Sequence, residues 1–479
     1  MSQPVVLWFR EDLRIADHAA LEAAVESGAP VVPVFVLDDE APGDWRLGGA
    51  SRWWLHHSLS ALGASLEKLG SPLVVRSGRT VDVLASLVRE TNAGAVYFHR
   101  RYEAVDREIE SALHASIGET VEVRRFAGRL LNEPEAVSNA AGDPFRVFTP
   151  FWKACLRLPE PHPPRPAPSM LKGPAAPVKG LPLDALDLLP AGPDWSGGLR
   201  DAWEPGEKGA HRRLESFVED AASRYHDRRD IPGDPGTSAL SPHLHFGEIS
   251  PRQVWHAVRV AQQADSSLTR GGDAFLRELG WREFCHHLLF NWPEMPREPF
   301  NPKFSSFPWK EDGAGFAAWT RGMTGYPMVD AGMRELWHTG WMHNRVRMLT
   351  ASFLVKHLLI PWQRGEAWFW DTLVDADLAN NACSWQWVAG SGADAAPYFR
   401  IFNPVLQGEK FDKRGHYVRR WVPELARLPD KHLHKPFAAP AAVLSQAGVR
   451  LGDTYPHPVV EHDFARRRAL DAFDRVRNR

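Results

Sequence analysis

The feature that most restricts how this chain can fold is a proline-rich segment in its first half. Eleven prolines occur within residues 159–193. Proline fixes φ and carries no backbone N–H, so neither a regular helix nor a central strand can continue through such a segment. The whole chain, at 479 residues, is also longer than one hydrophobic core usually supports. We therefore predict two domains joined by a proline-rich linker at 133–208.

The residues before this segment predict a parallel sheet. Between the strand-like runs, leucines from Leu55 to Leu69 recur at helical spacing. Repeated strand–helix units are typical of a parallel sheet covered by helices, so we predict a Rossmann-like α/β domain over 1–132. No GxGxxG motif follows the first strand, which argues against a nicotinamide dehydrogenase. The predicted strands are 5–9, 31–37, 73–76, 95–98 and 121–125.

The residues after the linker have almost no strand pattern. Apolar residues such as Val346, Leu349 and Phe353 recur at helical spacing, and most of the 20 tryptophans lie in this half. We predict a large all-α domain over 209–479.

Composition and charge limit the setting in which the protein works. The formal net charge is −2, so the chain has no global basic field to attract nucleic acid, and any such site must come from local clustering. The three cysteines form no CxxC pair and indicate a reducing compartment. The N-terminus is not a secretory signal, and no apolar stretch is long enough to span a bilayer. We expect a cytoplasmic protein that does not bind a membrane.

The segment 375–387 is the densest group of acids, amides and indoles in the chain. Its two acids stand two positions apart, as do its two indoles. On a helix this spacing turns side chains by about 200°, so the members of each pair should have different surroundings. A second polar segment lies at 341–348, where Asn344 and Met348 share one helical face. Capping acids and surface arginines are the simpler interpretation of either segment alone.

Several motifs in a fixed order make the chain similar to a known family. Together with the two segments above, they resemble the DNA photolyase/cryptochrome family, from Trp8 to His462. The likeness is greatest to the bacterial cyclobutane pyrimidine dimer photolyases grouped as class III. The further motifs lie at 8–14, 237–242, 281–284, 324–327 and 397–404.

The resemblance implies a noncovalent FAD, bent into a U shape inside the helical domain. Hydroxyl and backbone donors before a helix suit its phosphates, although a plain helix cap is the alternative. Asn381 matches the position facing flavin N5. An amide cannot lose a proton in the ordinary pH range, which suits a fully reduced anionic flavin and therefore repair. The positions that match cofactor-binding residues are Tyr225, Thr237, Ser238, Ala239, Leu240, Ser241, Arg282, Arg347, Asp375, Ala376, Asp377 and Asn381, with Arg347 as the partner of Asp375.

Three tryptophans match the family's chain of indoles that photoreduces the flavin from the protein surface. They are Trp385, Trp362 and Trp309. Large aromatic residues that only fill a helical core are the alternative.

The resemblance also implies that a pyrimidine dimer flips out of the DNA to reach the flavin. Glu278 in a desolvated pocket should have a raised pKa and could hydrogen-bond the dimer, whereas a salt bridge with Arg282 is the alternative. The catalytic positions are Glu278, Trp281, Asn344, Met348 and Trp387. The DNA-binding positions are Arg228, Arg229, Arg345 and Arg400 together with Glu278, Trp281, Asn344 and Trp387.

Related activities are excluded by particular residues. The (6-4) photolyases carry histidines where this chain has Asn344 and Met348, and three cysteines cannot hold a four-cysteine iron–sulfur cluster. His243 and His245 have no third ligand at convincing spacing, so we predict no metal site.

We therefore predict a light-driven lyase that splits cyclobutane pyrimidine dimers in DNA, acting as a monomer without an obligate protein partner. A cryptochrome-like photoreceptor is the alternative, against which Asn381 and the short tail after His462 argue. A flavin oxidoreductase would need a hydride-donor site that the sequence does not show. We expect methenyltetrahydrofolate as an antenna pigment near Arg52, Trp53 and Trp54, with a deazaflavin as the alternative.

Overall fold

The computed structural model describes residues 2–395 and 399–477, so Pro397 and Tyr398 of the motif at 397–404 lie outside the described residues. The chain forms two compact units. Unit 1 consists of Met1–Ser223, Ser238–Pro293 and Val374–Asp377, and unit 2 consists of Arg224–Thr237, Glu294–Leu373 and Leu378–Arg479. Each unit is described separately below.

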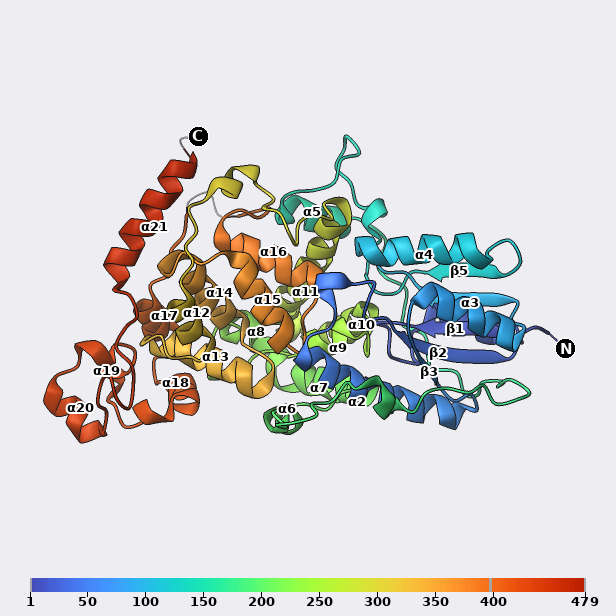
Figure 1. The fold of residues 1–479 in the computed structure, drawn as a ribbon, viewed down its shortest axis with the longest axis horizontal. Coiled ribbons are helices and arrows are strands. Elements are labelled where there is room, and N and C mark those ends of the chain that lie inside the picture. Colours follow the sequence, from blue (N-terminus) through green and yellow to red (C-terminus); the bar gives the residue numbers. More distant parts are fainter. Residues whose placement is uncertain (1, 396–398, 478–479) are drawn as a thin grey trace. The chain divides into compact units, whose positions relative to one another are not determined.

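Unit 1 contains a five-stranded parallel sheet in the order β3-β2-β1-β4-β5 (Figure 1). β1 is buried on both faces, which explains why its sequence is a continuous apolar run rather than an alternating one. The predicted Rossmann-like sheet is confirmed, and the predicted strands agree with the observed ones to within one residue at each end. The strands are β1 (Val5–Phe9), β2 (Val31–Leu37), β3 (Val74–Ser77), β4 (Ala95–His99) and β5 (Glu122–Phe126).

Four helices connect these strands: α1 (Ala19–Glu26), α2 (Gly49–Leu69), α3 (Thr80–Thr91) and α4 (Ala104–Ile117). In Figure 1, α3 and α4 lie side by side next to the sheet. Leu84, Leu87 and Leu113 from these two helices join the buried core beneath them.

Residues 133–208 are not a simple extended linker. Helix α5 (Phe148–Cys155) forms before the proline-rich part, which belongs to unit 1 and is joined to the end of α2 and to β3 by backbone hydrogen bonds. The N–H groups of Leu171 and Leu181 donate to the carbonyls of Leu69 and Val75. The non-proline residues therefore supply the donors that proline lacks, and they fix the segment along the helix end and the edge strand.

The rest of unit 1 is helical and carries part of the predicted site. Its helices are α6 (Gly197–Ala202), α7 (Glu207–Ser216), α9 (Ser241–His245), α10 (Pro251–Ala264) and α11 (Thr269–Asn291).

The described residues of unit 2 contain no strand and only one isolated bridge, Leu451–Tyr455, in agreement with the predicted helical character. The predicted bounds of the helical domain, 209–479, stay a prediction. Among the residues described, no helix is both long and apolar enough to cross a bilayer. The helices that matter below are α8 (Tyr225–Arg228), α12 (Gly313–Thr320), α13 (Pro327–Thr339), α14 (Asn344–Ser352), α15 (Trp362–Thr372), α16 (Leu378–Ala389), α17 (Pro404–Phe411), α18 (His416–Trp421) and α21 (His462–Arg477).

Candidate cofactor and DNA site

The two acids of the 375–387 segment lie in a turn before α16, not on a helix as the spacing argument assumed. Their side chains still have different partners. Ser241 Oγ donates to Asp375 Oδ2 at 2.5 Å, whereas Asp377 Oδ2 lies 3.2 Å from Arg129 Nη2. Burial alone would raise the pKa of Asp377, but the neighbouring His286 and His245 and the Arg129 guanidinium hold it well below its usual range. Asp377 is therefore an ionised, internally paired group of unit 1.

The loop before α9 has the strained geometry that is typical of ligand-binding turns. Ala239 has a φ of +48°, a left-handed conformation that residues with a β-carbon rarely adopt. The residue that precedes α9, Leu240, offers no side-chain hydrogen bond to the helix. α9 also has Pro242 in its first turn, so the alternative of a plain helix start stays open beside the phosphate-binding prediction. Thr237 of this predicted loop belongs to unit 2, and residues 238–241 belong to unit 1.

A buried ionic network surrounds Asp377 in unit 1. Arg129 pairs with Glu11 and Asp377 and lies 4.0 Å from Glu103. Glu103, His286 and Asp377 could in principle offer ligand atoms to a metal ion. The permanently charged Arg129 guanidinium already occupies the space beside two of these carboxylates, which disfavours a cation there.

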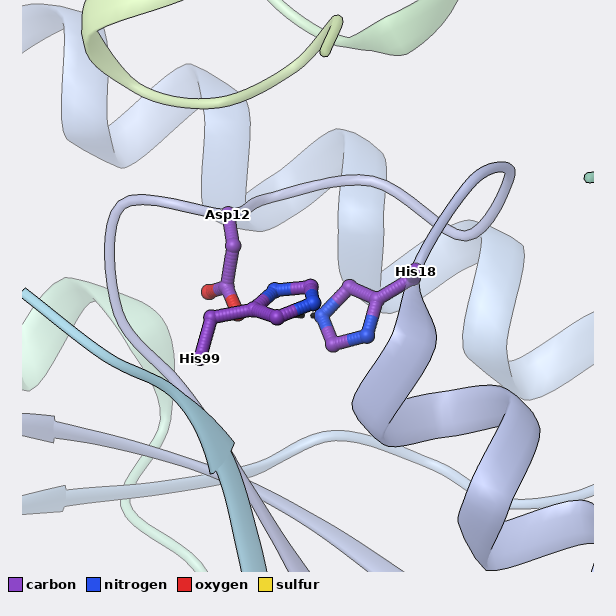
Figure 2. A group of neighbouring side chains, drawn as sticks. All are labelled: Asp12, His18 and His99. Atoms are coloured by element: carbon purple, nitrogen blue, oxygen red, sulfur yellow. Dashed lines mark hydrogen bonds and ion pairs between the residues drawn. The ribbon is translucent and has the colours of Figure 1, made fainter. Parts of the chain in front are cut away.

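A second buried group, Asp12, His18 and His99, follows β1 and β4 in the same unit. Figure 2 shows the carboxylate and the two imidazole rings directed toward one another. Asp12 Oδ2 lies 3.0 Å from His18 Nε2 and 2.9 Å from His99 Nδ1. The N–H of Leu21 donates to His18 Nδ1 at 3.0 Å, so the ring proton of a neutral His18 must sit on Nε2 and point at the carboxylate.

This tautomer leaves His18 Nε2 without a lone pair for a metal. Burial, together with the nearby His18, lowers the pKa of His99 to about 3, so this imidazole is neutral. The group is best described as a hydrogen-bonded clamp that joins the start of α1 to the end of β4.

The expected antenna residues Trp53 and Trp54 lie inside unit 1. Their side chains are 1% and 0% exposed, and Trp54 Nε1 donates to Glu248 Oε1 at 2.9 Å. Arg52 pairs with Asp39 at 2.5 Å and is the partly exposed residue of this stretch. The two indoles therefore have a packing role.

In unit 2, Asn381 on α16 faces α15. Its Nδ2 donates to the backbone carbonyl of Glu366 at 3.1 Å, which fixes the orientation of the amide. The Glu366 side chain is buried, and neither of its carboxyl oxygens has a hydrogen-bond partner among the described residues. Burial raises the pKa of Glu366 well above its usual range, so the group is a neutral acid.

The predicted relay tryptophans all belong to unit 2. Trp362 and Trp385 are buried, whereas Trp309 is partly exposed. α15 and α16 pack closely because residue 365 is glycine: a β-carbon there would lie 2.2 Å from Trp385 Cη2. The structure thus places one indole at the surface and two in the interior, as a relay or an aromatic core would require.

The predicted substrate residues of unit 1 share one face of α11. Glu278 and Trp281 are three positions apart and both are half-buried. The Trp281 ring stacks on Phe148 with centroids 3.8 Å apart, so one face of the indole is covered. Arg282, on the other hand, donates to the carbonyl of Arg129 and lies 3.5 Å from Glu283.

The predicted substrate residues of unit 2 lie on α14 and α16. Asn344 is exposed and Met348 is half-buried. Trp387 is half-buried and its Nε1 donates to the carbonyl of Asp394 at 3.1 Å, whereas Trp385 is buried. The two indoles therefore have different surroundings, as their spacing on a helix predicts. The predicted pairing of Arg347 with Asp375 stays a prediction.

A cationic groove of about 840 Å³ lies in unit 2 and includes two of the four predicted DNA-binding arginines, Arg345 and Arg400. Arg345 pairs with Asp230 at 2.8 Å, and its guanidinium lies 4.7 Å above the Phe411 ring. The other two, Arg228 and Arg229, do not line this groove. The groove is lined by Asp227, Asp230, Ile231, Arg345, Phe399, Arg400, Ile401, Phe402, Gln407, Lys410, Phe411, Lys413, Arg466 and Leu470.

Comparisons with known proteins agree with this geometry. Residues 5–169 match the family model "DNA photolyase", and residues 275–475 match "FAD binding domain of DNA photolyase". A deoxyribodipyrimidine photo-lyase of Agrobacterium fabrum is 52% identical over 99% of this chain and 98% of its own. The chain belongs to the DNA photolyase/cryptochrome family. Cryptochrome-1 of Arabidopsis thaliana is 40% identical over 98% of this chain and 70% of its own.

The fold is also similar to that of a relative whose structure has been solved. The crystal structure of a bacterial class III photolyase from Agrobacterium tumefaciens has a TM-score of 0.96 and 51% identity, over 100% of this chain and 98% of that one. The predicted family and the predicted α/β-plus-helical fold are confirmed. The individual roles assigned to site residues stay predictions.

The residues of this family member fit the FAD that the family model implies. On α15 and α16, the Glu366 carboxyl and the Trp385 Nε1 are buried without a hydrogen-bond partner among the described residues. Buried polar atoms normally have partners, so such atoms indicate a polar group that the protein itself does not supply. A flavin ring, with its carbonyls and ring nitrogens, is a group of this kind.

The sequence interpretation missed several of these residues. Glu366 lies in a segment rich in aromatic residues, and Lys410 and Lys413 stand close together with Arg414, so both signals were present. Trp319 gave no such signal. Its ring is buried with its centroid 6.2 Å from that of Trp385, and its Nε1 donates to the carbonyl of Thr350 at 3.0 Å.

Proposed function

We propose that this chain repairs cyclobutane pyrimidine dimers in DNA, using blue light and a noncovalently bound FAD. The observation that carries the proposal is the end-to-end similarity to an enzyme named deoxyribodipyrimidine photo-lyase, together with an asparagine at position 381. Reduced FAD supplies the chemistry of one-electron donation to the dimer under light and recovery of that electron after the ring opens. The reaction has no net redox change and needs no nicotinamide partner.

The cofactor is assigned to the positions that match the family's FAD-binding residues. The proposal assigns its phosphates to Tyr225 and the 237–241 loop, and its ring and ribose to Asp375, Asp377 and Asn381, with Arg282, Arg347 and Ala376 beside them. The amide of Asn381, oriented by its bond to Glu366, presents an acceptor without a removable proton. It would therefore leave the charge of the reduced ring in place.

The dimer would be bound by groups that suit two joined pyrimidines. Trp281, Trp387 and Met348 supply apolar surface, and Asn344 can donate to and accept from the base edges. Glu278 would hydrogen-bond a base carbonyl as a neutral acid, which stabilises negative charge that develops on the dimer.

The cationic groove would bind DNA backbone phosphates on one side of the pyrimidine dimer. Its five basic side chains exceed its two aspartates, and phosphate contacts of this kind dominate DNA affinity. Arg228 and Arg229 would contribute from outside the groove.

The proposal also covers the oligomeric state, the cellular compartment and the antenna pigment. We propose a monomeric cytoplasmic enzyme, in agreement with three cysteines that form no disulfide with one another. Methenyltetrahydrofolate remains the proposed antenna and a deazaflavin the alternative, bound outside the Trp53 and Trp54 rings.

A repair assay tests the proposal. Flavin-loaded, chemically reduced protein is mixed with dimer-containing oligothymidine under blue light, and recovery of thymine absorbance is followed. Light-dependent recovery is expected. A protein that absorbs light but restores no thymine would support the photoreceptor alternative instead.

Two variants test the assigned roles. Glu278→Ala should lower repair per photon by roughly tenfold and retain flavin, since one hydrogen bond to developing charge is lost. Asp273→Ala, an exposed acid on the same helix, is the matched control and should repair normally. Trp385→Phe should block photoreduction of the oxidised protein and spare repair by chemically reduced protein.

A further inference from the structure

Lys356 is a buried lysine in an apolar run, and the proposed chemistry does not use it. It lies in the helical turn Phe353–His357, and its residue is 3% exposed. Burying an ammonium group costs several kcal/mol unless the group has compensating partners. Burial and the nearby Arg400 lower the pKa of Lys356 to about 7, far below its usual range.

Both described contacts of the Lys356 amine go to two consecutive residues of one segment. Its Nζ donates to the backbone carbonyl of Arg400, and it lies 4.5 Å from the centroid of the Phe399 ring. No ion pair of Lys356 with an acid occurs among the described residues. The lysine is therefore directed at the backbone and ring of this segment and not at a counter-ion.

The segment that Lys356 holds is packed into an apolar cluster of unit 2 through Phe399 and Ile401. Residues 399–403 have no regular secondary structure. Phe399 anchors one end by stacking on Phe473 of α21, with centroids 4.7 Å apart and planes 7° apart. Lys356 and Arg400 both line a small hollow of about 50 Å³ beside Trp387, and Arg400 also lines the large cationic groove.

We propose that Lys356 is a positioning residue for DNA binding: by holding the Phe399–Arg400 backbone from inside unit 2, it directs Arg400 into the cationic groove. This inference rests on the proposed function, because it requires the groove to bind DNA phosphates. Lys356 itself contacts no DNA in this arrangement.

The test measures how DNA affinity depends on salt. Flavin-loaded full-length protein is titrated with a fluorescent oligothymidine that contains one thymine dimer, at several KCl concentrations. Losing one phosphate contact reduces the slope of log K against log[KCl] by about one. Arg400→Ala should show this change, with affinity about five- to tenfold weaker.

Lys356→Met, which keeps the length of the side chain, should reduce the slope by at least half as much as Arg400→Ala. The double variant should be no weaker than Arg400→Ala alone, because both changes remove the same contact. Lys172→Met is the matched control, since Lys172 also donates to a backbone carbonyl but is exposed and lies in unit 1. It should leave the slope unchanged.

Flavin absorbance and the thermal midpoint show whether each variant is folded, and Lys356→Arg, which keeps a donor and a charge, should recover part of the slope. Lys356→Met with the parental slope, or losses that add in the double variant, would overturn the positioning role. An unchanged slope in Arg400→Ala would instead refute the assignment of the groove to DNA phosphates, and with it this inference. Light-driven repair is judged separately by the thymine-recovery assay.

Discussion

A buried ionic network in unit 1 and a single buried carboxyl in unit 2 show two opposite environments for an acid. In unit 1, Arg129 is buried among Glu11, Glu103 and Asp377, and each carboxylate has a cationic neighbour. In unit 2, the buried Glu366 has no hydrogen-bond partner among the described residues. The pKa of Asp377 is therefore lowered, and that of Glu366 is raised.

The ionic network of unit 1 stabilises the fold, whereas the Glu366 carboxyl of unit 2 lies on a helix assigned to flavin binding. The charges of the unit 1 network are satisfied by residues of that unit, whereas the unsatisfied Glu366 carboxyl belongs to the residue whose backbone carbonyl accepts from Asn381. The paired charges of unit 1 connect its sheet, α11 and the 374–377 turn, and the unsatisfied groups of unit 2 lie on the helices assigned to the flavin.

The largest expected effect comes from breaking the ionic network of unit 1. Arg129→Met removes the shared cation and leaves buried carboxylates without it, so we expect a loss of about 3–5 kcal/mol in the free energy of unfolding. Urea unfolding measures this loss. Arg200→Met, which removes an exposed pair with Asp194, should have a much smaller effect, because water and salt screen exposed ion pairs. Equal effects in the two variants would contradict the stabilising role of the network.

The second effect concerns pH and should appear in unit 2. Burial raises the pKa of Glu335 to about 7, even though Tyr417 Oη donates to it at 2.5 Å. Between its unfolded and folded pKa values, the unfolded state releases a proton that the folded state retains, so stability falls as pH rises toward 7 and then levels off. The total loss should be about 3 kcal/mol.

Glu335→Gln should remove this slope, and urea unfolding between pH 5 and pH 8 measures it. A variant whose stability follows the same pH curve as the parent would show that Glu335 is already ionised in the folded protein.

Glu366→Leu should stabilise the flavin-free protein, because it removes a buried acid that has no hydrogen-bond partner among the described residues. In flavin-free protein, replacing an unsatisfied buried carboxyl should raise the free energy of unfolding by about 1–3 kcal/mol. The same variant should bind FAD more weakly, which equilibrium dialysis measures. Glu366→Gln is the control that keeps a polar group. Destabilised flavin-free protein would mean that the carboxyl is satisfied within unit 2.

The smallest effect is expected at the groove. Asp230→Asn removes the anion that pairs with Arg345, so DNA affinity should rise by up to about 1 kcal/mol, as measured by the fluorescence titration. Asp234→Asn, which releases Arg228 outside the groove, should change affinity less. Weaker binding by Asp230→Asn would show that Arg345 needs Asp230 to hold its position.

The sheet could be predicted from the sequence because its strands are short β-branched runs with clear boundaries, such as Val31–Leu37. The helical region followed from apolar periodicity. Helix α5 was absorbed into the predicted linker because it is only eight residues long and directly precedes the prolines. The turn at 375–377 was taken for helix because its spacing alone could not distinguish the two.

The chemistry of the site could be predicted only where a motif carried it. The pairing of Arg129 with Asp377 joins residues 248 positions apart, and no local pattern reports such a contact. The same holds for Lys356 and Arg400, which are 44 positions apart. Burial shifts the pKa values of Glu366 and Lys356, and burial depends on the folded structure rather than on the residues that are adjacent in the sequence.

The two units are interleaved along the sequence, which limits how the protein can be recombined or truncated. Each unit consists of three separate stretches of sequence. The shortest stretch, Val374–Asp377, belongs to unit 1 and stands in the sequence between two stretches of unit 2. No single cut yields either unit whole, so neither can be exchanged between genes as one cassette. Recombination and truncation must therefore respect the entire chain, and mutations on the two sides of an apparent boundary will be selected together.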